Sequence, residues 1–117
     1  VHLGKRCRIE RNTFKDNFFA IYLGKSSDCI VQDNEIVGPK TSEERSGNGI
    51  HIWDGRRHLI KNNRISGHRD GIYFEFVSDS TIANNRAKAR LRLICFRLLV
   101  IGGLAVRVKN HDETSAG

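Results

Sequence analysis

The residues with the clearest chemical potential lie in the stretch HRDGIYFEF, residues 68–76, which contains Asp70 and Glu75. Glycoside hydrolysis requires two carboxylates about 5–9.5 Å apart. Asp54 and Asp79 could complete such a pair, but none of these carboxylates recurs in a way that marks an active groove. The sequence also lacks the P-loop, the serine-hydrolase elbow and the HExxH metalloprotease motif. It therefore predicts a protein that is not an enzyme, with a fragment of a carbohydrate-active enzyme (a polysaccharide lyase, hydrolase or epimerase) as the alternative.

The same stretch also has an ordinary structural interpretation. Arg69 and Asp70 are adjacent and are expected to form an ion pair at a corner of the fold. Alternation along a strand predicts that Glu75 faces away from Phe74 and Phe76 and is therefore exposed to solvent.

The cysteines number three and stand at Cys7, Cys29 and Cys95. They form no CxxC pair and no Cys/His cluster of zinc-finger spacing, so a structural zinc site is not predicted. An odd number also argues against a framework of disulfides. Cys7 and Cys29 are nevertheless separated by an interval that recurs elsewhere in the chain.

A repeat with a period of 22 explains that interval. Four asparagines mark successive units of the repeat, each at the second position of a polar residue pair. The gaps between them are 22, 29 and 22 residues. The long gap contains the polar segment PKTSEER, residues 39–45, and without this segment the period is 22 throughout. Insertions of this kind are typical of solenoids. The anchors of the repeat are Asn12, Asn34, Asn63 and Asn85.

Aliphatic columns keep the same register. Ile9, Val31, Ile60 and Ile82 align, and the segments GIHIWD and GIYFEF alternate with the period of two that is typical of strands. Short strands with one 22-residue period predict an all-β fold, a right-handed parallel β-helix of about four coils. Asparagine tolerates the left-handed backbone of a tight corner, and stacked carboxamides can hydrogen-bond along a column. The anchor asparagines are therefore expected to form a structural ladder.

Stacking of the coils also predicts a candidate binding surface. The outward positions that follow the Ala20, Gly49 and Gly71 column carry aromatic and polar side chains. Such a patch can stack sugars or dock a protein partner, although aromatic residues also occur on exposed sheets for cross-strand packing alone. The candidate residues are Tyr22, His51 and Tyr73, with Trp53 and Glu75 two residues further along their strands.

A second column contains Cys7, Cys29, His58 and Ser80. Soft sulfur and imidazole ligands suit Cu(I), so copper is a possible ligand of the first three residues. The alternatives are small buried cysteines that behave as hydrophobes, or a disulfide if the protein is exported.

The repeat predicts one domain over residues 1–86 and a distinct, irregular tail over residues 87–117. One further repeat unit predicts glycine at position 93 and asparagine at position 107, but the chain has Leu93 and Arg107. The tail is aliphatic with interspersed arginines. It is either a capping element or an unrelated peptide from a shifted reading frame.

The net charge of +7 does not indicate a nucleic-acid partner. Residues 1–86 hold 14 basic and 11 acidic side chains, whereas residues 87–117 hold 6 and 2, so more than half of the excess lies in the tail. No basic stripe interleaved with stacking aromatics is present. No apolar segment has the character of a signal peptide or of a direct membrane span.

The block GNGIHIWDGRRHLIKNNRISGHRDGIYFEFVSDSTIANNR, residues 47–86, resembles the NosD family of periplasmic β-helical maturation factors for nitrous oxide reductase. The resemblance rests on GNGIHIW, on ISGHRDGIYFEFV and on the spaced NNR corners, and it extends over residues 7–86. It implies a non-enzymatic accessory role in assembly of a copper centre. It also implies an ABC-type ATPase and permease and the copper enzyme as partners, and a periplasmic location.

Overall fold

Every described element of the chain is a β-strand. The computed structural model describes residues 1–39, 47–89, 96–99, 106–109 and 112–115, with the strands beyond residue 86 described by their backbone pairing. This part of the chain holds no helix of the length and apolarity needed to cross a bilayer. The strands are β1 (Arg8–Glu10), β2 (Thr13–Lys15), β3 (Phe19–Gly24), β4 (Ile30–Gln32), β5 (Glu35–Val37), β6 (Asn48–Arg56), β7 (Leu59–Lys61), β8 (Arg64–Ser66), β9 (Asp70–Ser78), β10 (Ser80–Ala83), β11 (Arg86–Ala89), β12 (Phe96–Leu99), β13 (Val106–Lys109) and β14 (Asp112–Ser115).

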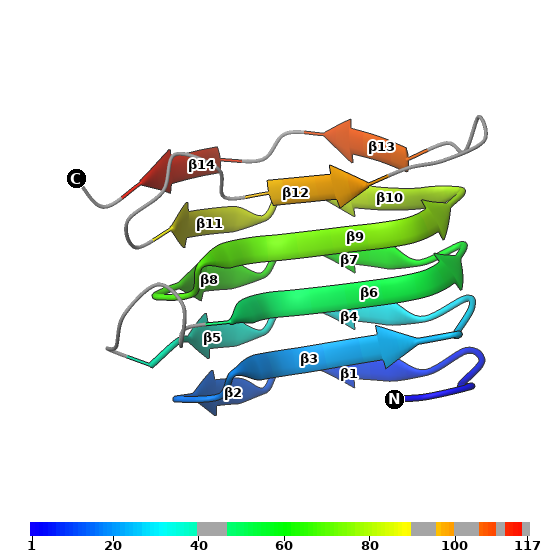
Figure 1. Cartoon of the computed structure of the whole chain (residues 1–117), viewed down its shortest axis with the longest axis horizontal. Helices are drawn as coiled ribbons and strands as arrows, with labels where there is room; N and C mark the ends of the chain where they lie inside the picture. The colour runs from blue at the N-terminus through cyan, green and yellow to red at the C-terminus, as the bar shows by residue number, and fades with distance from the viewer. Residues whose placement is uncertain (40–46, 90–95, 100–105, 110–111, 116–117) are drawn as a thin grey trace.

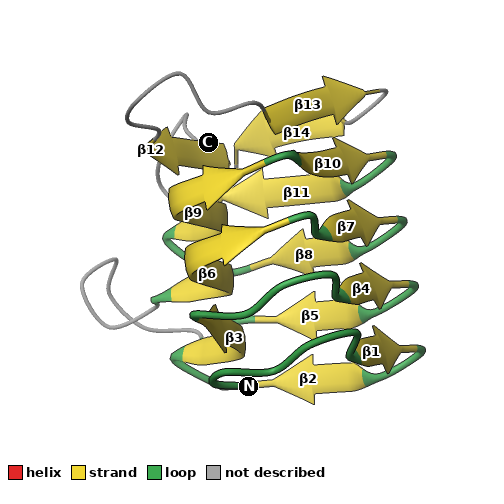
Figure 2. Ribbon diagram, turned by 90° about the vertical axis from the view of Figure 1, so that its right-hand side faces the viewer, coloured by secondary structure: helices red, strands yellow, loops and turns green. Residues whose placement is uncertain are grey.

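These strands form three parallel sheets, and each of the first four turns of the chain contributes one strand to each sheet (Figures 1 and 2). The sheet orders are β1-β4-β7-β10-β13, β14-β11-β8-β5-β2 and β12-β9-β6-β3. Consecutive coils therefore lie one strand spacing apart, about 4.8 Å. The parallel β-helix predicted from the repeat is confirmed.

The register of the sheets follows the repeat of the sequence. Ile9 pairs with Val31, Val31 with Ile60, and Ile60 with Ile82, which gives the same intervals of 22, 29 and 22 along the chain. The long interval contains the predicted insertion at residues 39–45, of which residues 40–45 lie outside the described residues.

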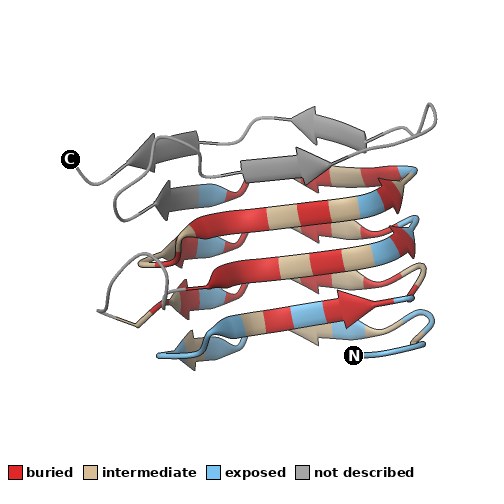
Figure 3. Ribbon diagram, viewed as in Figure 1, coloured by how far each residue is buried: buried red, intermediate tan, exposed pale blue. Residues whose placement is uncertain are grey.

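The core is a column of aliphatic side chains enclosed by the three sheets, and the buried bands repeat from coil to coil (Figure 3). The glycine column results from this packing. A Cβ at Gly49 would lie 2.6 Å from Ile65 Cγ2 and 2.7 Å from the Gly71 carbonyl oxygen. The buried apolar residues are Ile21, Leu23, Cys29, Val31, Ile36, Ile50, Ile52, Ile60, Ile65, Ile72, Phe74, Val77 and Ile82.

The anchor asparagines form a hydrogen-bonded ladder through the interior of the corner. Asn34 Nδ2 donates to Asn63 Oδ1 at 2.9 Å, and Asn63 Nδ2 donates to Asn85 Oδ1 at 3.0 Å. At the end of the ladder, Asn12 Nδ2 donates to Asn34 Oδ1 at 3.2 Å. Each carboxamide therefore replaces the hydrogen bonds that the turning backbone cannot make in regular sheet geometry.

The anchors themselves do not adopt the left-handed conformation that the sequence led us to expect. The left-handed residue is the one before each anchor, because the chain turns there and the anchor then directs its side chain inward. Those residues are Arg11, Asp33, Asn62 and Asn84, with φ angles of 56°, 57°, 56° and 55°.

Beyond residue 86 the backbone continues to pair in parallel with the preceding coil. Ile72 pairs with Phe96 and Arg86 with Asp112, so these coils are longer than the period of the repeat. The domain boundary at residue 86 and the nature of residues 87–117 remain predictions, since residues 90–95, 100–105, 110–111 and 116–117 lie outside the described residues.

Candidate functional site: an aromatic ladder on the β3–β6–β9 sheet

The outer face of the β3–β6–β9 sheet carries a row of aromatic rings. Tyr22 pairs with His51, and His51 pairs with Tyr73, so three coils present one ring each at the same position. Their neighbours in the strands, such as Ile50 and Ile52, are fully buried in the core. Strand alternation therefore forces the three rings outward.

Phe19 extends this row, and we name Phe19, Tyr22, His51 and Tyr73 the aromatic ladder. The ring centroids of Tyr22 and His51 are 5.2 Å apart, and those of His51 and Tyr73 are 4.8 Å apart, at interplanar angles of 22° and 29°. Phe19 lies 4.8 Å from His51 and 5.9 Å from Tyr22. Phe18 lies 4.7 Å from Phe19 and extends the apolar surface. These spacings are those of favourable aromatic pairs.

The central imidazole is held by a buried polar group. The His51 Nδ1 atom lies 2.9 Å from the carboxamide of Asn48. In the amide orientation that satisfies His51 and Asp70, Asn48 Oδ1 accepts from His51, and Asn48 Nδ2 donates to Asp70 Oδ2 at 3.1 Å. Burial lowers the pKa of His51, against an opposing effect of Glu75. The ladder therefore has a neutral, oriented imidazole at its centre near neutral pH.

The rim of the ladder is polar. Tyr73 donates its hydroxyl hydrogen bond to Glu75 Oε2 at 3.0 Å. Lys25 Nζ lies 5.5 Å from the centroid of the Trp53 ring, which is a cation–π distance. Trp53 pairs with Gly24 of the preceding coil and with Glu75 of the following coil, so the three residues occupy the same position in successive strands. All five residues predicted for the binding surface thus lie on one sheet face.

The predicted orientation of Phe76 is wrong. Its φ angle is 58°, and the side chain is 39% exposed rather than buried beside Phe74. The strand turns at this position, as it does at Lys25 and Asp54 in the coils before it, with φ angles of 48° and 55°. A left-handed residue breaks the alternation on which the prediction depended.

Asp70 is unsuited to an acid–base pair with Glu75. It is fully buried, and Arg69 Nε lies 3.3 Å from its Oδ2 atom, which is the ion pair expected at this corner. His68 is 1% exposed. A carboxylate with no exposed surface cannot contact a polymeric substrate.

The column of Cys7, Cys29, His58 and Ser80 has the predicted order, but His58 makes structural hydrogen bonds to its neighbours in the column. The Cys29 amide donates to His58 Nδ1 at 3.2 Å, and the His58 amide donates to Ser80 Oγ at 3.0 Å. Because Nδ1 accepts a backbone hydrogen bond, the neutral ring carries its proton on Nε2, which leaves no lone pair for a metal. Among the described residues, no group of three His, Cys, Asp or Glu side chains could hold a metal ion. Cys7 and Cys29 remain free thiols in adjacent coils.

Sequence reasoning missed Phe18 and Phe19, which are 49% and 37% exposed. Phe19 pairs with Asn48, so no repeated aromatic residue marks its column. The only available signal was the Phe-Phe pair at the start of a predicted strand.

The fold agrees with a comparison with known protein families. The family model described as right handed beta helix region matches residues 1–96. The chain belongs to this family. The Pseudomonas aeruginosa protein named "Probable ABC transporter binding protein NosD" is 36% identical over 65 residues, which are 54% of this chain and 15% of that protein. The matched stretch is thus a small part of that relative. No solved structure matches the chain.

Proposed function

We propose that the chain is a non-catalytic binding β-helix of the NosD type, with an accessory role in maturation of nitrous oxide reductase. The aromatic ladder carries this proposal, and the similarity to the Pseudomonas aeruginosa protein gives it direction. The proposed partners are an ABC-type ATPase and permease and the copper enzyme, in the periplasm.

The physical argument for docking is the exposure of the ladder. Phe19 and Tyr22 of the ladder remain 37% and 36% exposed, and the adjacent Phe18 is 49% exposed, on a sheet whose other face is the core. Tyrosine and tryptophan are enriched among the residues that dominate binding energies, because they bury much area at a small loss of conformational entropy. Trp53 and Glu75 supply a partly polar rim, which is the usual organisation of a protein interface.

A carbohydrate-active enzyme is the second candidate function. The row of flat rings favours it, since such rings can stack on sugars. The burial of Asp70 counts against it. Turnover of an acidic polysaccharide that Glu75→Ala abolishes would replace the first proposal with this one.

The proposed role can be tested by deleting the gene in its host and measuring nitrous oxide during anaerobic growth on nitrate. We expect nitrous oxide to accumulate and the wild-type gene to restore its consumption. A variant with Tyr22→Ser, His51→Ser and Tyr73→Ser should fail to restore it. Lys15→Ser, an exposed change on β2, is the matched control. Normal nitrous oxide consumption in the deletion strain would refute the proposal.

Copper remains a proposed ligand of Cys7 and Cys29 alone. Thiolates select Cu(I), and two sulfurs suffice for a linear site. Burial raises the pKa of Cys29, so binding must displace a proton from a shielded thiol. This predicts slow uptake of the metal that accelerates with rising pH.

A further inference from the structure

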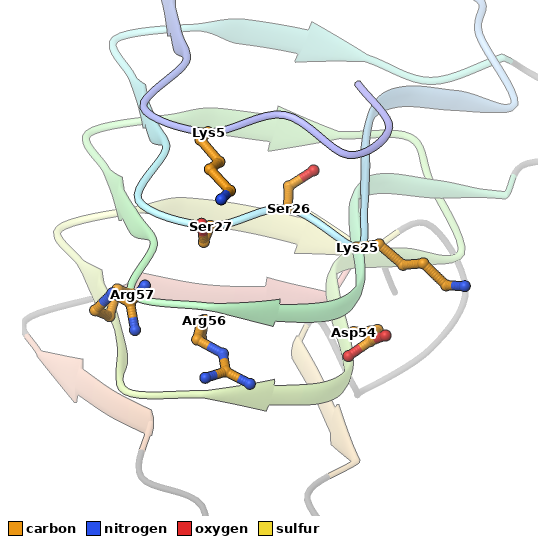
Figure 4. Close-up of a pocket in the computed structure, with 7 residues that line it drawn as sticks. All are labelled: Lys5, Lys25, Ser26, Ser27, Asp54, Arg56 and Arg57. Carbon is orange, nitrogen blue, oxygen red and sulfur yellow. The ribbon is translucent and has the colours of Figure 1, made fainter.

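A basic recess lies at another corner of the β-helix, between the aromatic sheet and the β1–β4–β7 sheet. It has a volume of about 410 Å³ (Figure 4). Four cationic side chains and one carboxylate line it, which gives a formal charge of +3. The lining residues are Lys5, Lys25, Ser26, Ser27, Asp54, Arg56 and Arg57.

Three consecutive coils build the recess. Lys5 pairs with Ser27, and Ser27 pairs with Arg56, so these residues follow one another along a single column (Figure 4). The backbones of Lys5 and Arg56 are two coil spacings apart, about 10 Å. The small Ser27 residue lies between Lys5 and Arg56 in this column. In Figure 4 the Lys5 side chain extends towards Ser27, and the Arg56 side chain extends away from it.

The cations of the recess differ in how far their charge is already compensated. Arg57 donates to both carboxylate oxygens of Asp28, at 2.8 and 3.1 Å. Lys25 Nζ lies over the ring of Trp53. Within the described part of the chain, Lys5 and Arg56 have no carboxylate within ion-pair distance.

We propose that this recess binds a phosphate or sulfate group, between Lys5 and Arg56. A guanidinium matches the oxygens of such an anion in a two-pronged geometry, and an ammonium adds a point charge from the opposite side. A tetrahedral oxyanion placed over Ser27 would contact the Lys5 ammonium directly and the Arg56 guanidinium after a change of its rotamer. This site is separate from the aromatic ladder and does not depend on the proposed function.

Titration of the full chain, followed by the backbone amide signals of residues 25–28 and 54–57 in NMR spectra, tests the proposal. Inorganic phosphate, inorganic sulfate and glucose 6-phosphate are compared with nitrate at constant ionic strength. We expect saturable shifts with the first three ligands at about millimolar concentration, and weaker shifts with the monovalent nitrate. Tighter binding of glucose 6-phosphate would assign the group to an ester of a larger molecule. Equal responses to phosphate and nitrate would overturn the proposal.

Charge variants make the test specific to the recess. Lys5→Gln and Arg56→Gln should each weaken phosphate binding about two- to five-fold, the range for single exposed ion pairs. Asp54→Asn removes the opposing charge and should tighten binding, whereas Lys15→Gln on β2 should leave it unchanged. All four residues are exposed, so thermal melts of the variants should match the wild type. Equal effects of Lys5→Gln and Lys15→Gln would show screening by net charge and contradict a site.

Discussion

Substitution of Asn63 by alanine probes the interaction that links the coils at their corner. The Asn63 side chain is fully buried and makes four hydrogen bonds. Its Oδ1 accepts from the backbone amide and the carboxamide of Asn34, at 3.1 and 2.9 Å. Its Nδ2 donates to the Val31 carbonyl and to Asn85 Oδ1, both at 3.0 Å. The substitution therefore removes a hydrogen-bond partner from Val31 and Asn34 in the preceding coil and from Asn85 in the following coil, and it leaves the buried Asn34 amide without its acceptor.

The expected loss of stability follows from these bonds. At about 1 kcal/mol for each hydrogen bond, with the penalty for the buried amide of Asn34, Asn63→Ala should destabilise the chain by about 3–5 kcal/mol. Asn12 makes one such side-chain bond at an exposed position, so Asn12→Ala should cost about 1 kcal/mol. Asn17→Ala, which removes an exposed bond to the Lys15 carbonyl, is the surface control.

Urea unfolding followed by circular dichroism measures all three variants. We expect the midpoint of Asn63→Ala to fall by about 2 M, with little change in the m-value. Hydrogen exchange of the Asn34 amide should accelerate strongly in the same variant, because its acceptor is gone. A midpoint for Asn63→Ala equal to that of Asn12→Ala would refute the ladder as a source of stability.

Three further outcomes follow from the core, the histidines and the thiols. Gly49→Ala should lower the thermal midpoint markedly, since its Cβ would lie 2.6 Å from a core methyl group; an unchanged midpoint would contradict the packing of the column. Burial lowers the pKa of His51 and His58 below 6.5, so the unfolded chain binds protons that the native chain excludes. The free energy of unfolding should therefore be highest above pH 6.5 and decline as the pH falls below it, and His58→Asn should make that decline smaller. A free energy of unfolding that does not change with pH in the wild type would contradict the neutral imidazoles. In competition titrations with Cu(I), Cys29→Ser should lower affinity at least about tenfold and His58→Asn should not, whereas an unchanged affinity for Cys29→Ser would exclude the thiol pair.

The fold could be predicted because the sequence repeats at a fixed interval. In a parallel β-helix, residues one period apart stack directly, so an alignment of the sequence with itself is already a register. Ile9, Val31, Ile60 and Ile82 illustrate this, since their column in the sequence is their column in the sheet. The same logic brought Tyr22, His51 and Tyr73 together.

The features that the sequence did not reveal are those that break the repeat or depend on backbone conformation. Phe19 stands opposite an asparagine, so no column marked it as part of the ladder. The exposure of Phe76 depends on a left-handed backbone conformation, and the equivalent residues of the two preceding coils are Lys25 and Asp54. The use of His58 Nδ1 as a backbone acceptor required the hydrogen-bond geometry, because a histidine between two cysteines and a serine resembles a metal ligand in sequence alone.

The most direct test of the central claim is site-specific photo-crosslinking in the host during anaerobic growth on nitrate. A photoreactive amino acid is introduced at position 51, at the centre of the aromatic ladder, and at position 15 as the control. Cross-linked products are identified by mass spectrometry. If the aromatic ladder is a docking surface, position 51 should give cross-links to a subunit of the ABC-type transporter or to nitrous oxide reductase, and position 15 should not. Absence of both partners at position 51, or equal capture at the two positions, would contradict it.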